Sequence, residues 1–192
     1  NAQKAIEQWR TVLRSEPANA AARDALKRLY RATGSFNHLA DLLRTDLERI
    51  APGDAAARLP ILREIASIYR EHIKSDSALV TVLSQIIALD GHDAVAVREL
   101  ARVYEALGRW RDLLTTQMRL AELYNVMGQK KEAADTYLGY AQRLFDRGEV
   151  DEAQKLVDRA LEVDSHNATA LLRKARALGA ANNDAAAIAT LS

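Results

Sequence analysis

The side chains that could carry out catalysis or bind a metal ion are scattered through this sequence. The chain has four histidines, and none lies three or four residues from another, so they do not form the helical pair of a zinc site. These residues are His38, His72, His92 and His166. There is no cysteine, which excludes a thiolate nucleophile, a disulfide framework and a cysteine-bearing zinc site. We therefore expect no metal ion and no cofactor.

Motifs that bind phosphate or activate a nucleophile are absent from the sequence. It contains no glycine-rich phosphate-binding loop and no Gly-x-Ser-x-Gly elbow. Carboxylate pairs such as Asp151 and Glu152 lie in helical patterns, where they are typical of an exposed face with weak ion pairs. We predict that the chain has no catalytic residues and is not an enzyme.

Overall charge and hydropathy argue against two classes of partner. The net charge is +1, so no overall field would attract nucleic acid or an anionic membrane, although a local basic patch is compatible with this balance. No apolar stretch reaches the roughly 18–20 residues that a membrane-spanning helix needs. We expect neither nucleic-acid binding nor membrane insertion. The lack of cysteine fits the cytoplasm and the periplasm alike, and we favour the cytoplasm.

Composition and periodicity predict an all-α protein. Of the 192 residues 48% are hydrophobic and three are proline, and strong helix formers dominate. The segment 79–87 is rich in β-branched residues, but its apolar residues are spaced by three and four, which favours a helix over a strand. Apolar spacing and turn residues indicate about eleven helices, at residues 2–15, 18–32, 36–50, 56–73, 76–88, 93–106, 109–126, 130–146, 150–163, 167–180 and 184 to the end.

A repeat runs through all of these helices. Equivalent slots hold an aromatic or leucine at spacings of 39, 35, 40 and 34 residues, namely Tyr30, Tyr69, Tyr104, Leu144 and Leu178. Turn signals follow the first helices at Gly34, Gly108, Gly148 and 182–184, and helix N-caps are expected at Asp54, Asp93 and Asn167. We predict a single repeat domain, 1–192. It would contain a partial repeat at 1–17, complete repeats at 18–53, 54–91, 92–128 and 129–165, and a truncated repeat at 166–192.

Small and bulky residues recur at fixed places in these helices. One set of first-helix positions holds Leu100-Ala101, Tyr104 and Gly108, and one set of second-helix positions holds Ala5, Trp9, Val12-Leu13 and Pro17. The pattern continues at Ala133, Tyr137, Tyr140-Ala141, Leu144, Gly148, Ala153, Val157 and Ala160-Leu161. It resembles the tetratricopeptide repeat family, which implies a right-handed superhelical solenoid of antiparallel helix pairs. Because the chain opens on a second helix and arginine outnumbers lysine, we expect a fragment of a longer bacterial protein of this family.

The resemblance implies that the first helix of each pair lines an inner wall that binds partners. In the first three units the equivalent positions hold six arginines, which are Arg28, Arg31, Arg63, Arg70, Arg98 and Arg102. Since guanidinium groups bind carboxylates in a bidentate manner, this wall would suit an acidic peptide. The alternative is that the arginines pair with the intervening Asp24, Glu71 and Glu105 or are simply solvated.

Apolar residues occupy the corresponding positions farther along the chain. Leu138, Phe145 and Leu172 could hold a hydrophobic anchor of the partner, or could close against neighbouring helices. Trp110, near the start of a predicted helix, is either an exposed contact residue or packs against the preceding turn. We treat Leu138, Phe145 and Leu172, together with the six arginines, as the candidate partner-binding set.

The sequence thus predicts a non-catalytic scaffold that binds a peptide or partner protein on its inner wall. The lysine–asparagine carboxylate clamp of the family's chaperone-binding members is not reproduced at Arg28 or Arg63, so a chaperone tail is not expected. One alternative is a regulatory or substrate-positioning domain of a larger enzyme. Another is an RNA-binding helical repeat, which the balanced charge disfavours. Dimerisation through the truncated ends is a further expectation.

Overall fold

The structure is a computed structural model that describes residues 1–180 and 189–190. Ten α-helices and one π-helical turn account for most of this range, and no strand occurs among the described residues. The predicted all-α architecture is confirmed. The helix predicted from residue 184 onward and the turn at 182–184 lie outside the described residues, apart from 189 and 190.

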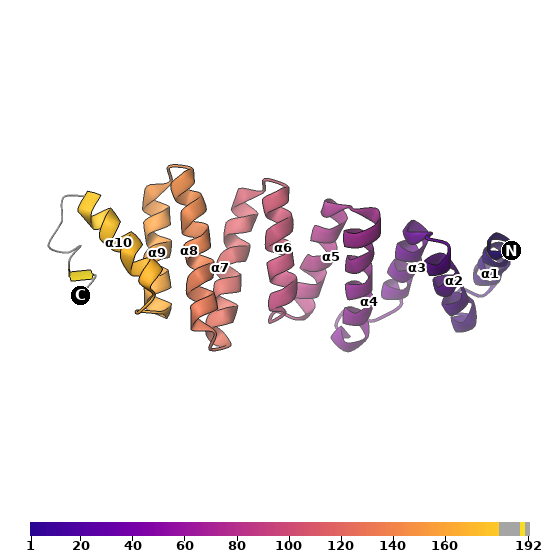
Figure 1. Cartoon of the computed structure of the whole chain (residues 1–192). Helices are drawn as coiled ribbons and strands as arrows, with labels where there is room; N and C mark the ends of the chain where they lie inside the picture. Colours follow the sequence, from indigo (N-terminus) through magenta and orange to yellow (C-terminus); the bar gives the residue numbers. More distant parts are fainter. Residues whose placement is uncertain (181–188, 191–192) are drawn as a thin grey trace. The chain divides into compact units, whose positions relative to one another are not determined.

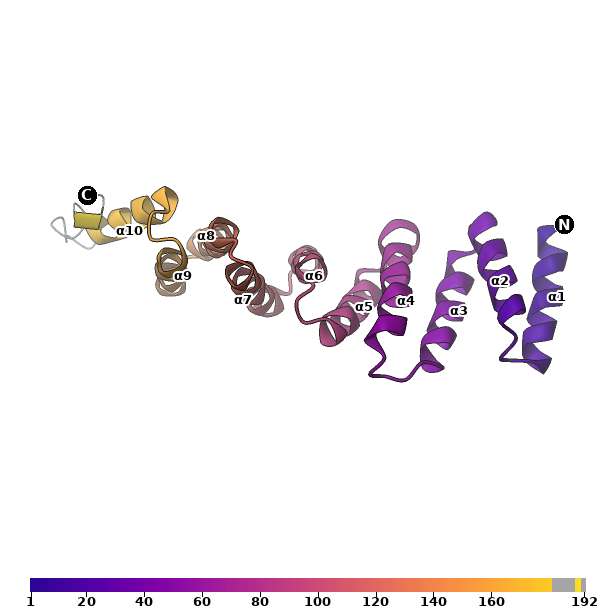
Figure 2. The same cartoon turned by 90° about the horizontal axis from the view of Figure 1, so that it is seen from below.

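The chain divides into two compact units, at residues 1–91 and 92–192. The first unit contains α1 (Ala2–Ser15), α2 (Ala20–Ala32), α3 (Phe36–Glu48), α4 (Ala55–Ile68), the π-helical turn η1 (Tyr69–Ile73) and α5 (Asp76–Leu89). The second contains α6 (Ala94–Ala106), α7 (Trp110–Val126), α8 (Lys130–Asp146), α9 (Val150–Val163) and α10 (Ala168–Ala180). Within each unit, helices that follow one another in the chain pack side by side (Figures 1 and 2). The segment 79–87 lies inside α5 and is therefore helical, as its spacing predicts.

One kind of turn leads into a helix whose N-terminus is capped by an Asn or Asp side chain. The side chains of Asn19, Asp54, Asp93 and Asn167 each accept a hydrogen bond from the backbone N–H three residues later, at 2.9, 3.0, 2.9 and 3.1 Å. Such a cap satisfies one of the N–H groups that have no partner inside the helix. These caps begin α2, α4, α6 and α10, and the three that the sequence predicts are confirmed.

The other kind of turn ends its helix on a glycine with positive φ. Gly34, Gly108, Gly128 and Gly148 have φ values of 67°, 66°, 75° and 78°, where a side chain would be strained. The N–H after each glycine donates to the carbonyl five residues earlier, for example from Arg109 to Tyr104 at 2.9 Å. This is the Schellman arrangement, which closes the helix with a left-handed residue.

The turn after η1 departs from that pattern by one residue. Here the left-handed residue is Lys74, with φ 56°, and the N–H of Ser75 donates to the carbonyl of Tyr69, six residues earlier, at 3.2 Å. The π-helical turn accommodates one inserted residue without ending the helix early. The insertion contributes to the irregular repeat period.

Buried alanines and large apolar residues alternate in the core. Ala22, Ala121, Ala141 and Ala160 are fully buried, which allows neighbouring helices to approach closely. Larger side chains such as those of Leu26, Leu43, Leu62, Leu83, Val97, Leu113 and Val157 fill the remaining space and are almost completely buried. One buried carboxylate, Asp46, lies in this packing and is bound by Arg23 and by Lys27, the latter at 2.7 Å.

Candidate interaction surfaces

The candidate arginines of the first unit are mostly engaged within the chain. Arg31 forms an ion pair with Glu64, Arg63 lies 3.8 Å from Asp90, and Arg70 lies 3.3 Å from Glu71. The hydrogen bond from Ser67, followed by that from Arg70, lowers the pKa of the Glu71 carboxyl, so it stays anionic beside Arg70 at neutral pH. Arg28 is exposed and has no polar partner among the described residues.

Of the two candidate arginines of the second unit, one is bound within the chain and the other is exposed. Arg98 donates to the hydroxyl of Tyr124 and its guanidinium lies 5.6 Å from the centre of that ring. Arg102 is exposed and, within the described part of the chain, has no polar partner. Of the acids expected to pair with these arginines, Glu71 does so, whereas Glu105 binds Arg143 at 2.8 Å. Among the described residues, the structure therefore brings no set of unpaired candidate arginines together within either unit.

The three apolar candidates of the second unit do not form one exposed patch. Leu138 is only 4% exposed, so its side chain cannot contact a partner, and its inclusion among the binding residues is corrected here. Its carbonyl accepts a hydrogen bond from Arg173 at 2.9 Å, which ties α8 to α10. Phe145 is half-buried and Leu172 is 42% exposed.

Several grooves in the surface lie away from the candidate residues, and the sequence analysis did not predict them. Each is a groove between two helices that are second members of their pairs, with the intervening first helix as its floor. In the first unit, α1 and α3 flank a groove of about 410 Å³ over α2, and α3 and α5 flank one of about 480 Å³ over α4. In the second unit, α7 and α9 flank a groove of about 470 Å³ over α8. We call these the α1/α3, α3/α5 and α7/α9 grooves.

The α7/α9 groove has an apolar lining. Leu114 and Met118 come from α7, Tyr140 and Leu144 from α8, and Leu156 from α9. Burial raises the pKa of the Tyr140 hydroxyl above its ordinary value, so this group is neutral at physiological pH. The stripe on α7 is readable in the sequence as a spacing of four, beside the separate stripe that faces the core.

Trp110 stands at one end of this groove and is 41% exposed. Its indole nitrogen would lie 3.9 Å from a Cβ at Gly108, so the ring lies against the preceding turn as well as being open to solvent. The guanidinium of Arg147 is 5.3 Å from the centre of the ring, which fixes one face. Trp110 is therefore partly exposed and also packs against the preceding turn.

The charged residues at the rim of the α7/α9 groove are largely paired with one another. Arg147 binds Glu149 at 2.9 Å, Lys155 binds Glu152 at 2.6 Å, and Arg159 lies 3.3 Å from Glu162. Opposite charges at such distances leave little net field over the apolar lining. The groove is thus suited to apolar side chains.

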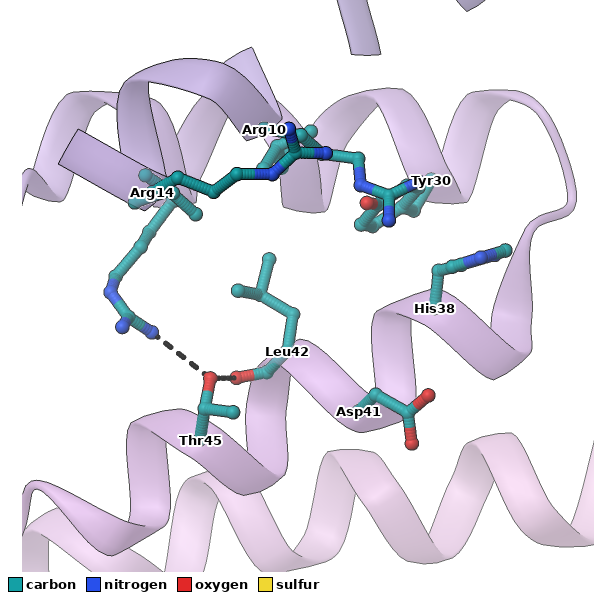
Figure 3. A pocket seen from close by; sticks show the side chains of 10 residues that line it. Arg10, Arg14, Tyr30, His38, Asp41, Leu42 and Thr45 are labelled. Carbon is teal, nitrogen blue, oxygen red and sulfur yellow. Dashed lines mark hydrogen bonds between the residues drawn. The ribbon is translucent and has the colours of Figure 1, made fainter. Parts of the chain in front are cut away.

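The lining of the α1/α3 groove contains more charged and polar side chains on its two flanking helices (Figure 3). Arg10 and Arg14 lie on one side, and His38, Asp41 and Thr45 lie on the other.

The third groove, between α3 and α5, contains two arginines that already have partners. Arg58 donates to the carbonyls of Leu47 and Ile50, and Arg44 lies over the ring of Tyr69 at 5.4 Å.

The structure brings no metal-binding cluster together in the part of the chain that it describes. No three histidine or acidic side chains among these residues are placed as metal ligands would be. His38 stacks on Tyr30 with ring centres 5.4 Å apart, and His72 stacks on Phe36 at 3.5 Å. None of the described helices is long and apolar enough to cross a membrane.

A model of the tetratricopeptide repeat matches residues 134–177. This range begins near the start of α8, includes all of α9 and ends within α10, and its glycine turn and Asx-capped helix start recur elsewhere in the chain. The matched segment is therefore identified as a tetratricopeptide repeat. Among curated proteins, none matches the sequence.

Several solved structures are similar to this chain at low identity. BtubC from P. vanneervenii is 16% identical, with a TM-score of 0.46 over 99% of this chain and 85% of that protein. MamA is 21% identical, with a TM-score of 0.48 over 88% and 85%. YrrB, a tetratricopeptide repeat protein with an unusual peptide-binding site, is 14% identical, with a TM-score of 0.47 over 90% and 83%. The repeat is a protein-interaction fold, and its stacked helix pairs generally act as scaffolds.

Proposed function

We propose that this chain is a non-catalytic interaction module that binds an apolar segment of a partner protein in the α7/α9 groove. The observation that carries the proposal is the exposed indole of Trp110 beside an apolar lining. Tryptophan is enriched among the residues that dominate binding energy, and such residues lie next to well-formed hollows. A volume of about 470 Å³ is within the roughly 300–1,000 Å³ range of ligand sites.

The dimensions of the groove limit its occupant. Trp110, Leu114 and Met118 are spaced by four residues and share one face of α7 over about 12 Å. That length matches three or four residues of an extended peptide, or two turns of a helix. The occupant would therefore insert two or three apolar side chains. Arg111, exposed at the rim with no polar partner among the described residues, would favour an acidic residue beside them.

The inner-wall site predicted from the sequence is the competing location within the same function. Arg28 and Arg102 are exposed and without polar partners in the described part of the chain, which supports it. The other four arginines are already bound within the chain, and their release would cost interactions that an acidic peptide must replace. For this reason we place the principal contact in the α7/α9 groove.

Selection of random displayed peptides on the whole chain, followed by fluorescence anisotropy of the selected peptides, tests the location. We expect two or three apolar residues within about four positions of the selected sequences, to match the groove. Trp110→Ala and Met118→Glu should each weaken binding by at least about tenfold, as truncation of a dominant contact does.

Matched variants separate the two locations. Val126→Glu alters a 76% exposed residue of α7 that does not line the groove, and it should leave affinity unchanged. Circular dichroism should be the same for all variants. If Arg28→Glu with Arg102→Glu abolishes binding while Trp110→Ala does not, the inner wall is the site and the groove assignment is wrong.

Of the two alternatives for the whole protein, one leaves this contact in place and the other replaces it. A substrate-positioning domain of a larger enzyme would use the same groove to hold its substrate, and the flanking sequence of the gene distinguishes it from an adaptor. An RNA-binding repeat would instead retain a random RNA pool in a salt-sensitive manner. Retention of the pool that survives Met118→Glu would favour RNA over a peptide.

A further inference from the structure

The α1/α3 groove contains two cations that the fold does not use. Arg10 and Arg14 lie four residues apart on α1 and therefore on one face of that helix. Both are exposed, and neither has a polar partner among the described residues. This distinguishes them from Arg23 in the same groove, which binds Asp46, Thr45 and the carbonyl of Pro17. Two free guanidinium groups at one hollow provide an anion site.

Apolar and aromatic groups lie directly beside these cations. Leu13, Leu26 and Leu42 line the groove, and Leu42 projects into the space between the two sides (Figure 3). Tyr30 stacks on His38 at the end of the groove, with an interplanar angle of 23°. Burial raises the pKa of the Tyr30 hydroxyl, while the charge of Arg10 opposes that shift, so the hydroxyl keeps its proton at neutral pH and can donate.

One acid faces the groove from the opposite side. Asp41 lies on α3 and has no polar partner within the described residues. Its charge would repel a doubly charged anion such as phosphate more strongly than a carboxylate, because the repulsion scales with the charge. Asp41 can also accept a hydrogen bond from a backbone N–H. A peptide carries both that donor and the carboxylate.

We propose that the α1/α3 groove is a second binding site, which takes a short peptide segment with a carboxylate side chain next to an apolar residue. Arg10 and Arg14 bind the carboxylate, Leu13 and Leu42 contact the apolar side chain, and Asp41 accepts from the peptide backbone. The volume of about 410 Å³ fits a segment of a few residues. This site belongs to the first unit and does not depend on the function proposed for the α7/α9 groove.

Nuclear magnetic resonance of the whole ¹⁵N-labelled chain tests this assignment with three probes. The first is the tripeptide acetyl-Leu-Glu-Leu-amide, the second is its glutamine counterpart, and the third is inorganic phosphate. We expect the glutamate peptide to shift the amide signals of α1 and α3 around Arg14 and Thr45. The glutamine peptide should bind at least about tenfold more weakly, as loss of a charge-assisted contact implies.

Variants of the exposed arginines connect those shifts to the groove. Arg10→Gln with Arg14→Gln should weaken the glutamate peptide by about tenfold or more, whereas Arg28→Gln, an exposed arginine of α2 outside the groove, should have no effect. Equal binding of the two peptides would overturn the proposal. So would displacement of the peptide by phosphate at the same residues, which indicates a free-anion site. Absence of shifts at about 5 mM peptide, enough to saturate a Kd near 1 mM, would also overturn it.

Discussion

The α1/α3 and α7/α9 grooves are lined by equivalent positions and yet differ in chemistry. The third, sixth, seventh and tenth residues of α3 line the first groove, and the same four positions of α9 line the second. The sixth position is Asp41 in one and Lys155 in the other. The ninth residue of the opposite helix is Arg10 in α1 and Met118 in α7.

This correspondence shows which property of the repeat is general. Three successive helices joined by short turns produce a groove of similar size in each unit, at about 410 and 470 Å³. The side chains at a few positions then determine whether the groove is cationic or apolar. A repeat fold can therefore present different ligand chemistry without altering its backbone.

The floors of the two grooves are also stabilised differently. We expect the largest loss of stability from a substitution in the floor of the second unit. Leu144 is 3% exposed and lies under the α7/α9 groove. Leu144→Ala should lower the free energy of unfolding by about 3–4 kcal/mol, because it removes buried methyl groups and leaves a cavity. Urea denaturation and hydrogen exchange of α7–α9 measure this loss. Leu144→Met, which conserves volume, should cost less than about 1.5 kcal/mol; a loss near 1 kcal/mol for the alanine variant would contradict close packing of this floor.

In the first unit an ion network lies beside the groove. Asp46 binds Arg23 and Lys27, and the side chains of the three residues are 11%, 14% and 21% exposed. Asp46→Ala should cost about 2 kcal/mol, less than a fully buried pair because some solvent screening remains. Hydrogen exchange of α2 and α3 measures the change. Asp46→Asn removes the charge but keeps the shape and an acceptor, and it should cost less; equal losses for the two variants would mean that the charge alone causes the effect and that shape and acceptor contribute nothing.

An exchange of side chains between the grooves tests whether the correspondence extends to binding. Met118→Arg with Lys155→Asp reproduces in the α7/α9 groove the residues found at Arg10 and Asp41. We expect this double variant to bind acetyl-Leu-Glu-Leu-amide about tenfold more tightly at α7 and α9 than the unaltered chain, because it supplies a guanidinium for the carboxylate. Titration by nuclear magnetic resonance locates the site.

The control places the same charge on α7 outside the groove. Val126→Arg alters a residue that is 76% exposed and does not line it. A similar gain for Val126→Arg would mean that added positive charge, and not position in the groove, causes the binding.

Sequence patterns predicted the helices well because those patterns are local. The spacing of apolar residues and the Asx caps at Asp54, Asp93 and Asn167 each involve only neighbouring residues. Each groove depends on how three consecutive helices pack, and apart from the stripe on α7 the lining residues carry no shared local signal. The pairing of Arg31 with Glu64 likewise spans 33 residues, so the sequence could identify the arginines but not their partners.

Local patterns also could not determine which side chains are buried. Leu138 occupies a position that the family pattern assigns to the inner wall, yet its side chain is buried. Leu138 is the ninth of the 17 residues of α8, and its carbonyl accepts a hydrogen bond from Arg173 of α10. A pattern within one helix cannot show which neighbouring helix covers a position.

The smallest effect concerns the turns that lead into the flanking helices. Gly148, before α9, has φ 78°, and a Cβ there would meet no neighbouring atom within 4 Å, so Gly148→Ala should cost about 1 kcal/mol through backbone strain alone. Gly139→Ala, inside α8 with equally open space, should stabilise by about 0.5–1 kcal/mol. Thermal or urea denaturation measures both.

Lys74 provides the opposite test in the first unit. It occupies the left-handed position after η1 with φ 56°, where the other four turns have glycine. Lys74→Gly should raise the free energy of unfolding by about 0.5 kcal/mol, since relief of strain exceeds the added entropy of glycine in the unfolded chain. Lys74→Ala retains the strain and should give no gain. If both variants lower stability, the lysine side chain makes a contribution that the turn geometry does not explain, and the turns of the two units are not equivalent.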